Sequence, residues 1–262
     1  MNALREAILR GARATPRAGT AIAGRRPGGG FAFSQLRAYV EGDDPRRIDH
    51  AATARAGALQ TRVYLEETAL VFGAIVDESA SMRVGRRRSL ADAAAEALRA
   101  WFGAMDGDDR AARVVDARVV TDRRAAPLAS ARAPFDASAA VRIALRAVPR
   151  GASVLAILDG FDVPDDELLV RAALRFDATV LLARDPWRDD LPLRGFVTLR
   201  DAETARTRRL FVGERARRRY AAASHAREAA LLERFRRAGW RAGPLLEADG
   251  GASLRRAFGL AA

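Results

Sequence analysis

The hydrophobic positions along the chain predict strands that alternate with helices. Residues 70–76 form an almost continuous apolar run that ends at Asp77, and residues 154–158 form a second run that ends at Asp159. Short apolar runs of this kind are typical of strands buried on both faces of a parallel sheet. A third run at 178–183 indicates another strand of the same sheet.

Helices are expected between these strands. From Leu90 to Met105 apolar residues recur at helical spacing, which indicates a helix with one buried face. Further helices are predicted at 137–148, 165–175 and 214–238, with a closing helix from Ser253. Additional strands are predicted at 111–120, 125–131 and 240–246, with one or two short ones between 195 and 211. The alternation predicts an α/β fold with a doubly wound, mostly parallel central sheet flanked by helices.

The first thirty residues are expected to form a peripheral, flexible lead-in. A short helix is predicted from Ala3 to Arg10, and Pro16 and the triplet Gly28-Gly29-Gly30 follow it. We interpret the triplet as a flexible joint, because no strand precedes it and no Gly-Lys-Ser or Gly-Lys-Thr follows it to make a phosphate loop.

Residues 31–262 are then expected to form one domain, in which the segment 31–67 is an N-terminal extension packed on the sheet. That segment contains a tight turn rich in Gly, Asp and Pro at 41–49, and its residues 59–64 alternate like a half-exposed strand.

Charge and composition narrow the functional classes. The formal net charge is +12, every basic residue is Arg, and acidic residues are interleaved with them. A basic surface can attract nucleic acid. No nucleic-acid-binding motif is present, however, and the interleaving favours a solvated surface. An Arg-driven nucleic-acid binder is the alternative, and it would show binding that weakens steeply with salt.

The lack of Cys, of a membrane-spanning run and of a secretory signal predicts a cytoplasmic location. The chain has no Cys, so disulfides and thiolate metal sites are excluded. The longest apolar run, 69–76, is far shorter than the ~20 residues that cross a bilayer. Neither a secretory signal nor a membrane span is expected.

The candidate ligand-binding residues lie where two predicted strands end. The carboxyl ends of neighbouring parallel strands share one edge of a sheet, so Asp77 and Asp159 are expected to meet there. Ser79 and Ser81 follow Asp77 at a spacing that allows a loop to turn all three oxygens toward one point. Carboxylate and hydroxyl oxygens suit Mg²⁺. In the alternative interpretation, Asp77 only caps the following helix.

The segment from Val76 to Met82 resembles the metal-ion-dependent adhesion motif of von Willebrand factor A domains. Upstream, the Glu-Gly-Asp-Asp-Pro-Arg-Arg-Ile-Asp segment at 41–49 and the segment 54–59 resemble the signature of domain-of-unknown-function family fifty-eight. That bacterial family has a von Willebrand factor A-like fold. The resemblance extends from about Phe31 to the C-terminus, including Asp201-Ala202-Glu203-Thr204.

This resemblance implies a non-catalytic adaptor that works with a MoxR-type AAA+ ATPase in the maturation or remodelling of other proteins. In the general adhesion site a Thr from a second loop and an Asp from a third complete the metal shell, and a partner's carboxylate fills an open position. Asp159 matches the third element. The second loop has no Thr, and Ser138 or Asp136 would have to substitute, so the implied magnesium site is degenerate.

Two other interpretations of the charged residues stay open. A Mg²⁺-dependent phosphoryl-transfer enzyme could use Asp77 as nucleophile with Asp159, although Ser79 stands where a second acid is normally wanted. Arg46, Arg47 and Asp49 are candidates for a partner-facing patch near the metal end. Alternatively, they pair with other charged residues of the turn and pin it against the sheet.

Overall fold

A six-stranded sheet forms the centre of the protein. The computed structural model describes residues 3–14, 26–66, 70–115, 118–121 and 135–261. The strand order is β10-β7-β6-β3-β4-β5, and every neighbouring pair is parallel except β4 and β5. The strands are β3 (Val71–Val76), β4 (Arg110–Val115), β5 (Arg118–Val120), β6 (Ser153–Leu158), β7 (Asp177–Ala183) and β10 (Arg241–Leu245). The predicted fold class, a mostly parallel α/β sheet flanked by helices, is confirmed.

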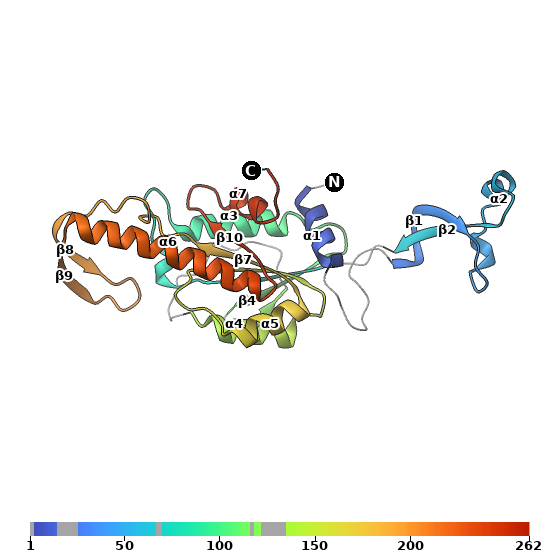
Figure 1. The fold of residues 1–262 in the computed structure, drawn as a ribbon. Coiled ribbons are helices and arrows are strands. Elements are labelled where there is room, and N and C mark those ends of the chain that lie inside the picture. The colour runs from blue at the N-terminus through green and yellow to red at the C-terminus, as the bar shows by residue number, and fades with distance from the viewer. Residues whose placement is uncertain (1–2, 15–25, 67–69, 116–117, 122–134, 262) are drawn as a thin grey trace.

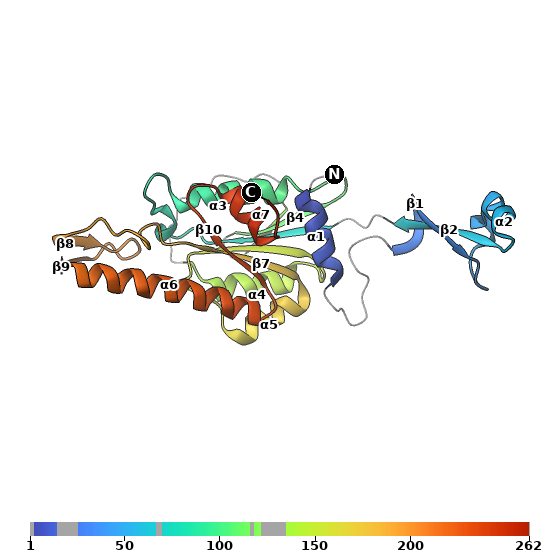
Figure 2. The ribbon, with the colours of Figure 1, turned by 45° about the horizontal axis from the view of Figure 1, so that its top comes forward.

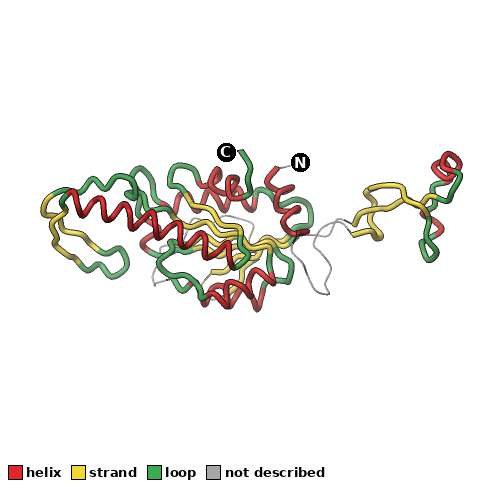
Figure 3. Tube along the Cα trace, viewed as in Figure 1, coloured by secondary structure: helices red, strands yellow, loops and turns green. Residues whose placement is uncertain are grey.

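Helices cover both faces of this sheet, as Figures 1 and 2 show. On one face lie α1 (Ala3–Ala14), α3 (Leu90–Phe102) and α7 (Gly250–Ala257), whose apolar side chains belong to one buried cluster. On the other face lie α4 (Ala137–Ala147), α5 (Asp166–Arg175) and the C-terminal part of α6 (Glu214–Arg237). The strands of the central sheet occupy the middle layer in Figure 3.

The central strands are apolar throughout because they are buried on both sides. In β3, Phe72 and Ala74 point into the cluster beneath α3, whereas Ile75 points into the cluster beneath α4. In β6, Leu155 belongs to the cluster beneath α3 and Ala156 to the cluster beneath α4. Burial on both faces removes the alternation of polar and apolar residues that a half-exposed strand would show.

Trp101 joins α3 to the middle of the sheet. Its side chain is fully buried, its ring packs edge-on against Phe72 at 5.2 Å, and its indole N–H donates to the Gly73 carbonyl at 3.0 Å. The residue therefore contributes both apolar contact and a satisfied polar group at the core.

The N-terminal helix is longer and more deeply packed than the expected lead-in. Leu4 and Ile8 of α1 are buried in the cluster with α3. Arg5 donates to the carboxylate of the buried Asp109, which also accepts the Leu70 backbone N–H at 2.8 Å. The described residues 3–14 are therefore part of the core, in contrast to the predicted peripheral segment.

A second, separate pair of strands follows α1. β1 (Arg26–Ala38) pairs antiparallel with β2 (Gln60–Glu66), and η1 (Pro45–Arg47) and α2 (His50–Ala56) lie between them in the chain. Figures 1 and 2 show these elements, here called the arm, apart from the central sheet. The N-terminal residues that do pack on the sheet are those of α1.

The prediction of a flexible joint at Gly28-Gly29-Gly30 is wrong, because the triplet lies inside β1. Pro27 and Ala32 are both opposite Leu65, so the residues between them form a bulge in the ladder. Glycine suits such an irregular strand because a side chain would restrict the backbone there.

Two other elements differ from their predicted extents. The single strand expected at 111–120 is instead the antiparallel pair β4 and β5. Helix α7 begins before Ser253, since Asp249 caps its first turn by accepting the Ala252 N–H at 2.7 Å. The return strand predicted at 125–131 lies outside the described residues. The short strands predicted near 195–211 are present as the antiparallel pair β8 (Gly195–Arg200) and β9 (Thr207–Val212).

Among the helices of the described residues, none is both long enough and apolar enough to cross a membrane.

Substitution of Trp101 tests the packing of α3 on the sheet. We expect Trp101→Phe to lower the free energy of unfolding by about 1–3 kcal/mol, because it removes a buried hydrogen bond and part of a ring. Urea unfolding measures this change. The same substitution at the partly exposed Trp187 is the matched control and should cost less than about 0.5 kcal/mol. Equal losses in the two variants would contradict the anchoring role of Trp101.

Candidate functional site

Two carboxylates meet at the carboxyl edge of the sheet. β3 and β6 are parallel neighbours, and the chain passes from β3 to β4 on one side and later to β6 on the other. The Asp77 N–H donates to the Ile157 carbonyl at 2.8 Å, and the Asp159 N–H donates to Asp77 Oδ2 at 3.2 Å. The site lies at the point where strand order reverses, which is where α/β sheets commonly bind ligands.

Two hydroxyls join these carboxylates. The Ser79 N–H donates to Asp77 Oδ1 at 2.9 Å, and the Ser79 and Ser81 Oγ atoms lie 2.9 Å apart. Ser81 Oγ donates in turn to Asp159 Oδ2 at 2.7 Å. The structure thus brings together the four residues that the sequence singled out most strongly.

The alternative interpretation of Asp77 as a helix cap is wrong. Helix α3 is capped by Ser89, whose hydroxyl accepts the Asp92 N–H at 3.1 Å while the Asp92 carboxylate accepts the Ser89 N–H. Ser79, at the start of η2 (Ala80–Arg83), makes no side-chain capping bond either. Its hydroxyl therefore faces Ser81 instead of a helix end.

The environment of Asp77 disfavours its charged form. Its side chain is about 1% exposed. Burial raises the pKa of Asp77 to about 6; hydrogen bonds from Ser79 oppose that rise, and the negative charge of Asp159 adds to it. A positive charge bound at this point would lower the free-energy cost of ionising the Asp77 carboxyl.

Glu78, within the same loop, points elsewhere. It forms an ion pair with Arg113, a buried residue of the neighbouring strand β4. This pair ties the loop to the sheet and leaves Glu78 outside the group of four.

The loop that carries Asp159 has an exposed aromatic residue beside it. Asp159 Oδ1 accepts the Phe161 N–H at 2.7 Å, and Gly160 adopts a left-handed φ of 82° that favours glycine. The Phe161 side chain is 74% exposed, with the Arg227 guanidinium 4.2 Å from its ring centre. The rim of the site thus offers an apolar surface next to polar groups.

Ser138, the weakest candidate, is not joined to the group. Among the described residues it makes no hydrogen bond with any of the four. Asp136 caps α4 by accepting the Ala139 N–H at 2.7 Å. The Ala137 N–H donates to Asp162 at 2.6 Å, so the start of α4 does lie beside the loop that follows β6.

One residue of the site was not identified as a candidate from sequence. The Ser81 N–H donates to Glu203 Oε1 at 2.7 Å, from a turn 122 positions away between β8 and β9. Hydrophobic periodicity cannot reveal a contact over that separation. The only signal was the resemblance of Asp201–Thr204 to the family's C-terminal portion.

The three partner-facing candidates lie on the arm. Asp49 caps α2 by accepting the Ala52 N–H at 2.8 Å and pairs with Arg62 at 2.9 Å. Arg47 lies 3.9 Å from Asp44, and Arg46 is exposed. These contacts stabilise the arm itself and are not directed at the central sheet.

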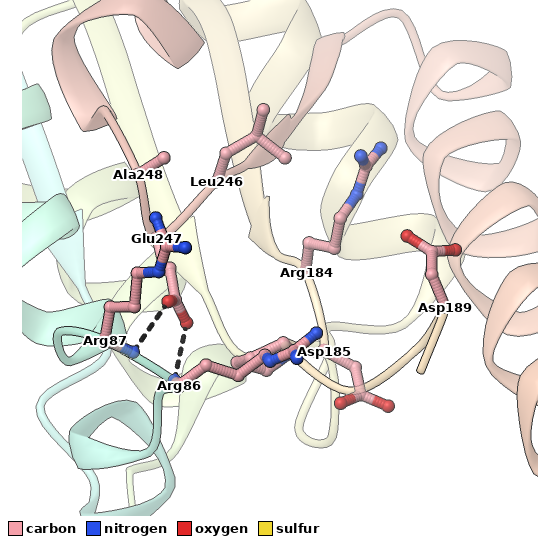
Figure 4. A pocket seen from close by; sticks show the side chains of 9 residues that line it. Arg86, Arg87, Arg184, Asp185, Asp189, Leu246, Glu247 and Ala248 are labelled. Carbon is pink, nitrogen blue, oxygen red and sulfur yellow. Dashed lines mark hydrogen bonds between the residues drawn. The ribbon is translucent and has the colours of Figure 1, made fainter. Parts of the chain in front are cut away.

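A pocket of about 390 Å³ lies at the carboxyl ends of β7 and β10 (Figure 4). Glu247 accepts the backbone N–H groups of Arg86 and Arg87 at 2.8 and 2.9 Å, which holds the loop before α3 against the end of β10. On the other side Asp185 accepts from Tyr220 and Ser224 of α6. The pocket is lined by Arg86, Arg87, Arg184, Asp185, Pro186, Asp189, Leu246, Glu247 and Ala248, and contains none of the four site residues.

The oxygens of the four-residue group are of the types that Mg²⁺ takes as ligands. Adjacent oxygens in an octahedral shell with bonds of roughly 2.1 Å lie about 2.9 Å apart. The Ser79–Ser81 and Ser81–Asp159 oxygen pairs, at 2.9 and 2.7 Å, are close to that separation. Within the described part of the chain, no three His, Cys, Asp or Glu side chains gather as a metal-binding group. A cation here would therefore keep several waters.

Comparison with known proteins identifies the family. Residues 35–230 match the family model described as "Protein of unknown function DUF58". The chain is 31% identical, over 81% of its length and 74% of theirs, to the uncharacterized proteins Rv1480 of Mycobacterium tuberculosis and Mb1516 of Mycobacterium bovis.

Two solved structures are also similar, each at 14% identity and a TM-score of 0.38. One is the conserved hypothetical protein BatB from Bacteroides thetaiotaomicron, covering 65% of this chain and 98% of that one. The other is an aerotolerance-related membrane protein from Bacteroides fragilis, covering 64% and 100%. The family match and the mycobacterial relatives together establish that the chain belongs to the DUF58 family.

Proposed function

We propose that the protein is a non-catalytic interaction module that binds an acidic side chain of a partner protein at the carboxyl edge of its sheet. The observation that carries this proposal is the meeting of Asp77, Ser79, Ser81 and Asp159 at the point where strand order reverses.

Mg²⁺ is the proposed mediator. When bound, it would supply positive charge to which a partner's carboxylate coordinates. Asp77, Ser79 and Ser81 would hold it directly or through water, and Asp159 would support it. Phe161 at the rim offers apolar contact to the segment that presents the carboxylate.

A MoxR-type AAA+ ATPase is the partner we propose, acting with this protein in the maturation or remodelling of other proteins in the cytoplasm. Membership of the DUF58 family supports this choice, together with the resemblance of the motif to adhesion sites.

The burial of Asp77 supports a binding role over phosphoryl transfer. Nucleophilic attack needs the reacting atoms within roughly 3–3.5 Å of each other. Asp77 is almost fully buried, and both of its oxygens accept backbone N–H groups. A substrate phosphorus could reach its oxygens only if the surrounding contacts opened.

Magnesium titration tests the metal site. At about ten times its Kd, Mg²⁺ should stabilise the protein by roughly 1.4 kcal/mol, measured by thermal shift and calorimetry. Ser81→Ala and Asp77→Ala should abolish this response, whereas Asp108→Ala, an exposed acid elsewhere, should keep it. If millimolar Mg²⁺ leaves the wild-type protein unchanged in both assays, the module acts without metal.

The raised pKa of Asp77 predicts a pH dependence of stability in the presence of a chelator. Because the pKa of the folded state is about 6 and the usual value is 3.8, folding takes up a proton between these values. The stability that this provides is present at low pH and is lost as pH rises through about 6. Relative to Asp77→Asn, the wild-type protein should lose up to about 3 kcal/mol across this window.

Urea unfolding below and above this window measures the loss, and Asp108→Asn is the matched control. Stability curves of the wild-type protein and Asp77→Asn that run parallel with pH would contradict the buried-carboxyl interpretation.

Affinity capture from the native cell tests the proposed partner. Wild-type protein should retain an AAA+ ATPase in Mg²⁺ and release it in chelator, and Ser81→Ala should retain much less. Equal recovery of the ATPase by the wild-type protein and Ser81→Ala would mean that it binds elsewhere on the molecule. Absence of any AAA+ ATPase would refute this choice of partner.

A further inference from the structure

The turn between β8 and β9 reaches back to the proposed binding site. Glu203 Oε1 accepts the backbone N–H of Ser81 at 2.7 Å, and the Ser81 hydroxyl is bonded to both Ser79 and Asp159. An intrachain carboxylate therefore lies against Ser81, one of the residues at which we propose that a partner's carboxylate binds.

The turn is built to present Glu203. Asp201 Oδ1 accepts the N–H groups of Glu203 and Thr204 at 3.1 and 2.6 Å, and the Thr204 hydroxyl at 2.8 Å. Ala205 has a φ of 57°, the only positive φ of a non-glycine residue in the described part of the chain. Backbone strain of this kind persists only where surrounding contacts hold it, and it is common at functional sites.

The charge of Glu203 is not used in an ion pair. Acidic residues of α6 pair with Arg, as Glu214 does with Arg217 and Glu228 does with Arg184. Among the described residues, Glu203 forms no salt bridge, although Arg side chains are abundant. Its strongest described contact is the Ser81 N–H.

Little apolar burial holds the pair of strands in place. Phe196 and Phe211 face each other across the pair at 5.2 Å, but they are 72% and 63% exposed. Leu199 is also exposed. Segments with few buried apolar contacts open at small cost in free energy, so the β8–β9 pair can leave the site without unfolding the core.

We propose that the β8–β9 pair is an intramolecular occupant of the site, in which Glu203 holds the place of the partner's acidic side chain until the partner displaces it. This inference rests on the proposed function, because it assumes that the site receives a carboxylate. It adds that the free protein is held in a self-occupied state.

Self-occupation lowers the apparent affinity for any external acidic ligand. A site that is open for only about a tenth of the time binds about tenfold more weakly than a permanently open one. Removing the Glu203 carboxylate should therefore strengthen binding of an external acidic ligand. Loss of an ordinary surface contact would leave that binding unchanged.

The test uses the chain's own turn as the probe. A fluorescent peptide of residues 198–208 is titrated against full-length protein by anisotropy in millimolar Mg²⁺. A second peptide with Gln in place of Glu203 shows whether binding needs the carboxylate. Glu203→Gln opens the site, Asp201→Asn loosens the turn while keeping Glu203, and Glu167→Gln on α5 is the charge-matched control.

We expect Glu203→Gln to bind the acidic peptide about tenfold more tightly than the wild-type protein and Glu167→Gln, with Asp201→Asn between them. Equal affinity of Glu203→Gln and wild type would overturn self-occupation and leave the proposed function standing. If no variant binds the acidic peptide, or if the Gln peptide binds as well, the site does not take a carboxylate and both proposals fail. Amide exchange at Ser81, expected to rise in Glu203→Gln, shows that the contact is released.

Discussion

The pairing of β3 with β6 places the carboxyls of Asp77 and Asp159 side by side. Burial already makes Asp77 costly to ionise, and the charge of Asp159 adds to that cost. Both strands are apolar and buried along their length, so the polar residues come after the strands, at the edge of the sheet. The Asp77 backbone is bonded to Ile157, and Asp159 is bonded to the Asp77 carboxylate. The position of the site therefore depends on strand order, and its chemistry depends on the loops that follow the strands.

The sheet and most helices could be predicted from sequence, because burial leaves periodic patterns. The apolar run at 154–158 and the apolar face of α3 are local sequence patterns, and the structure contains the strand and the helix that they predict. The predictions were wrong where tertiary context decided the outcome. Gly28-Gly29-Gly30 has the composition of a joint, yet pairing with β2 draws it into a bulged strand. The helix predicted at the N-terminus is present, but it is not peripheral, because Leu4 and Ile8 are buried in the core.

The candidate site was predictable to the extent that its residues follow strands. Asp77 and Asp159 end apolar runs, and Ser79 and Ser81 are close to Asp77 in sequence, so neighbouring strands suffice to bring them together. Ser138 was inferred only from a loose alignment, and the structure gives it no bond to the group. Glu203 was not named as a candidate because its position depends on a turn that leaves the sheet and returns to it.

Asp109 has a consequence for any force that acts on the protein. It accepts from Arg5 in α1 and from the Leu70 backbone at the start of β3, and the chain between those two residues includes the arm. Tension applied to the arm would therefore act on α1 and on the residue before β3, which share this buried carboxylate. Asp109 thus couples the two ends of the chain segment that carries the arm.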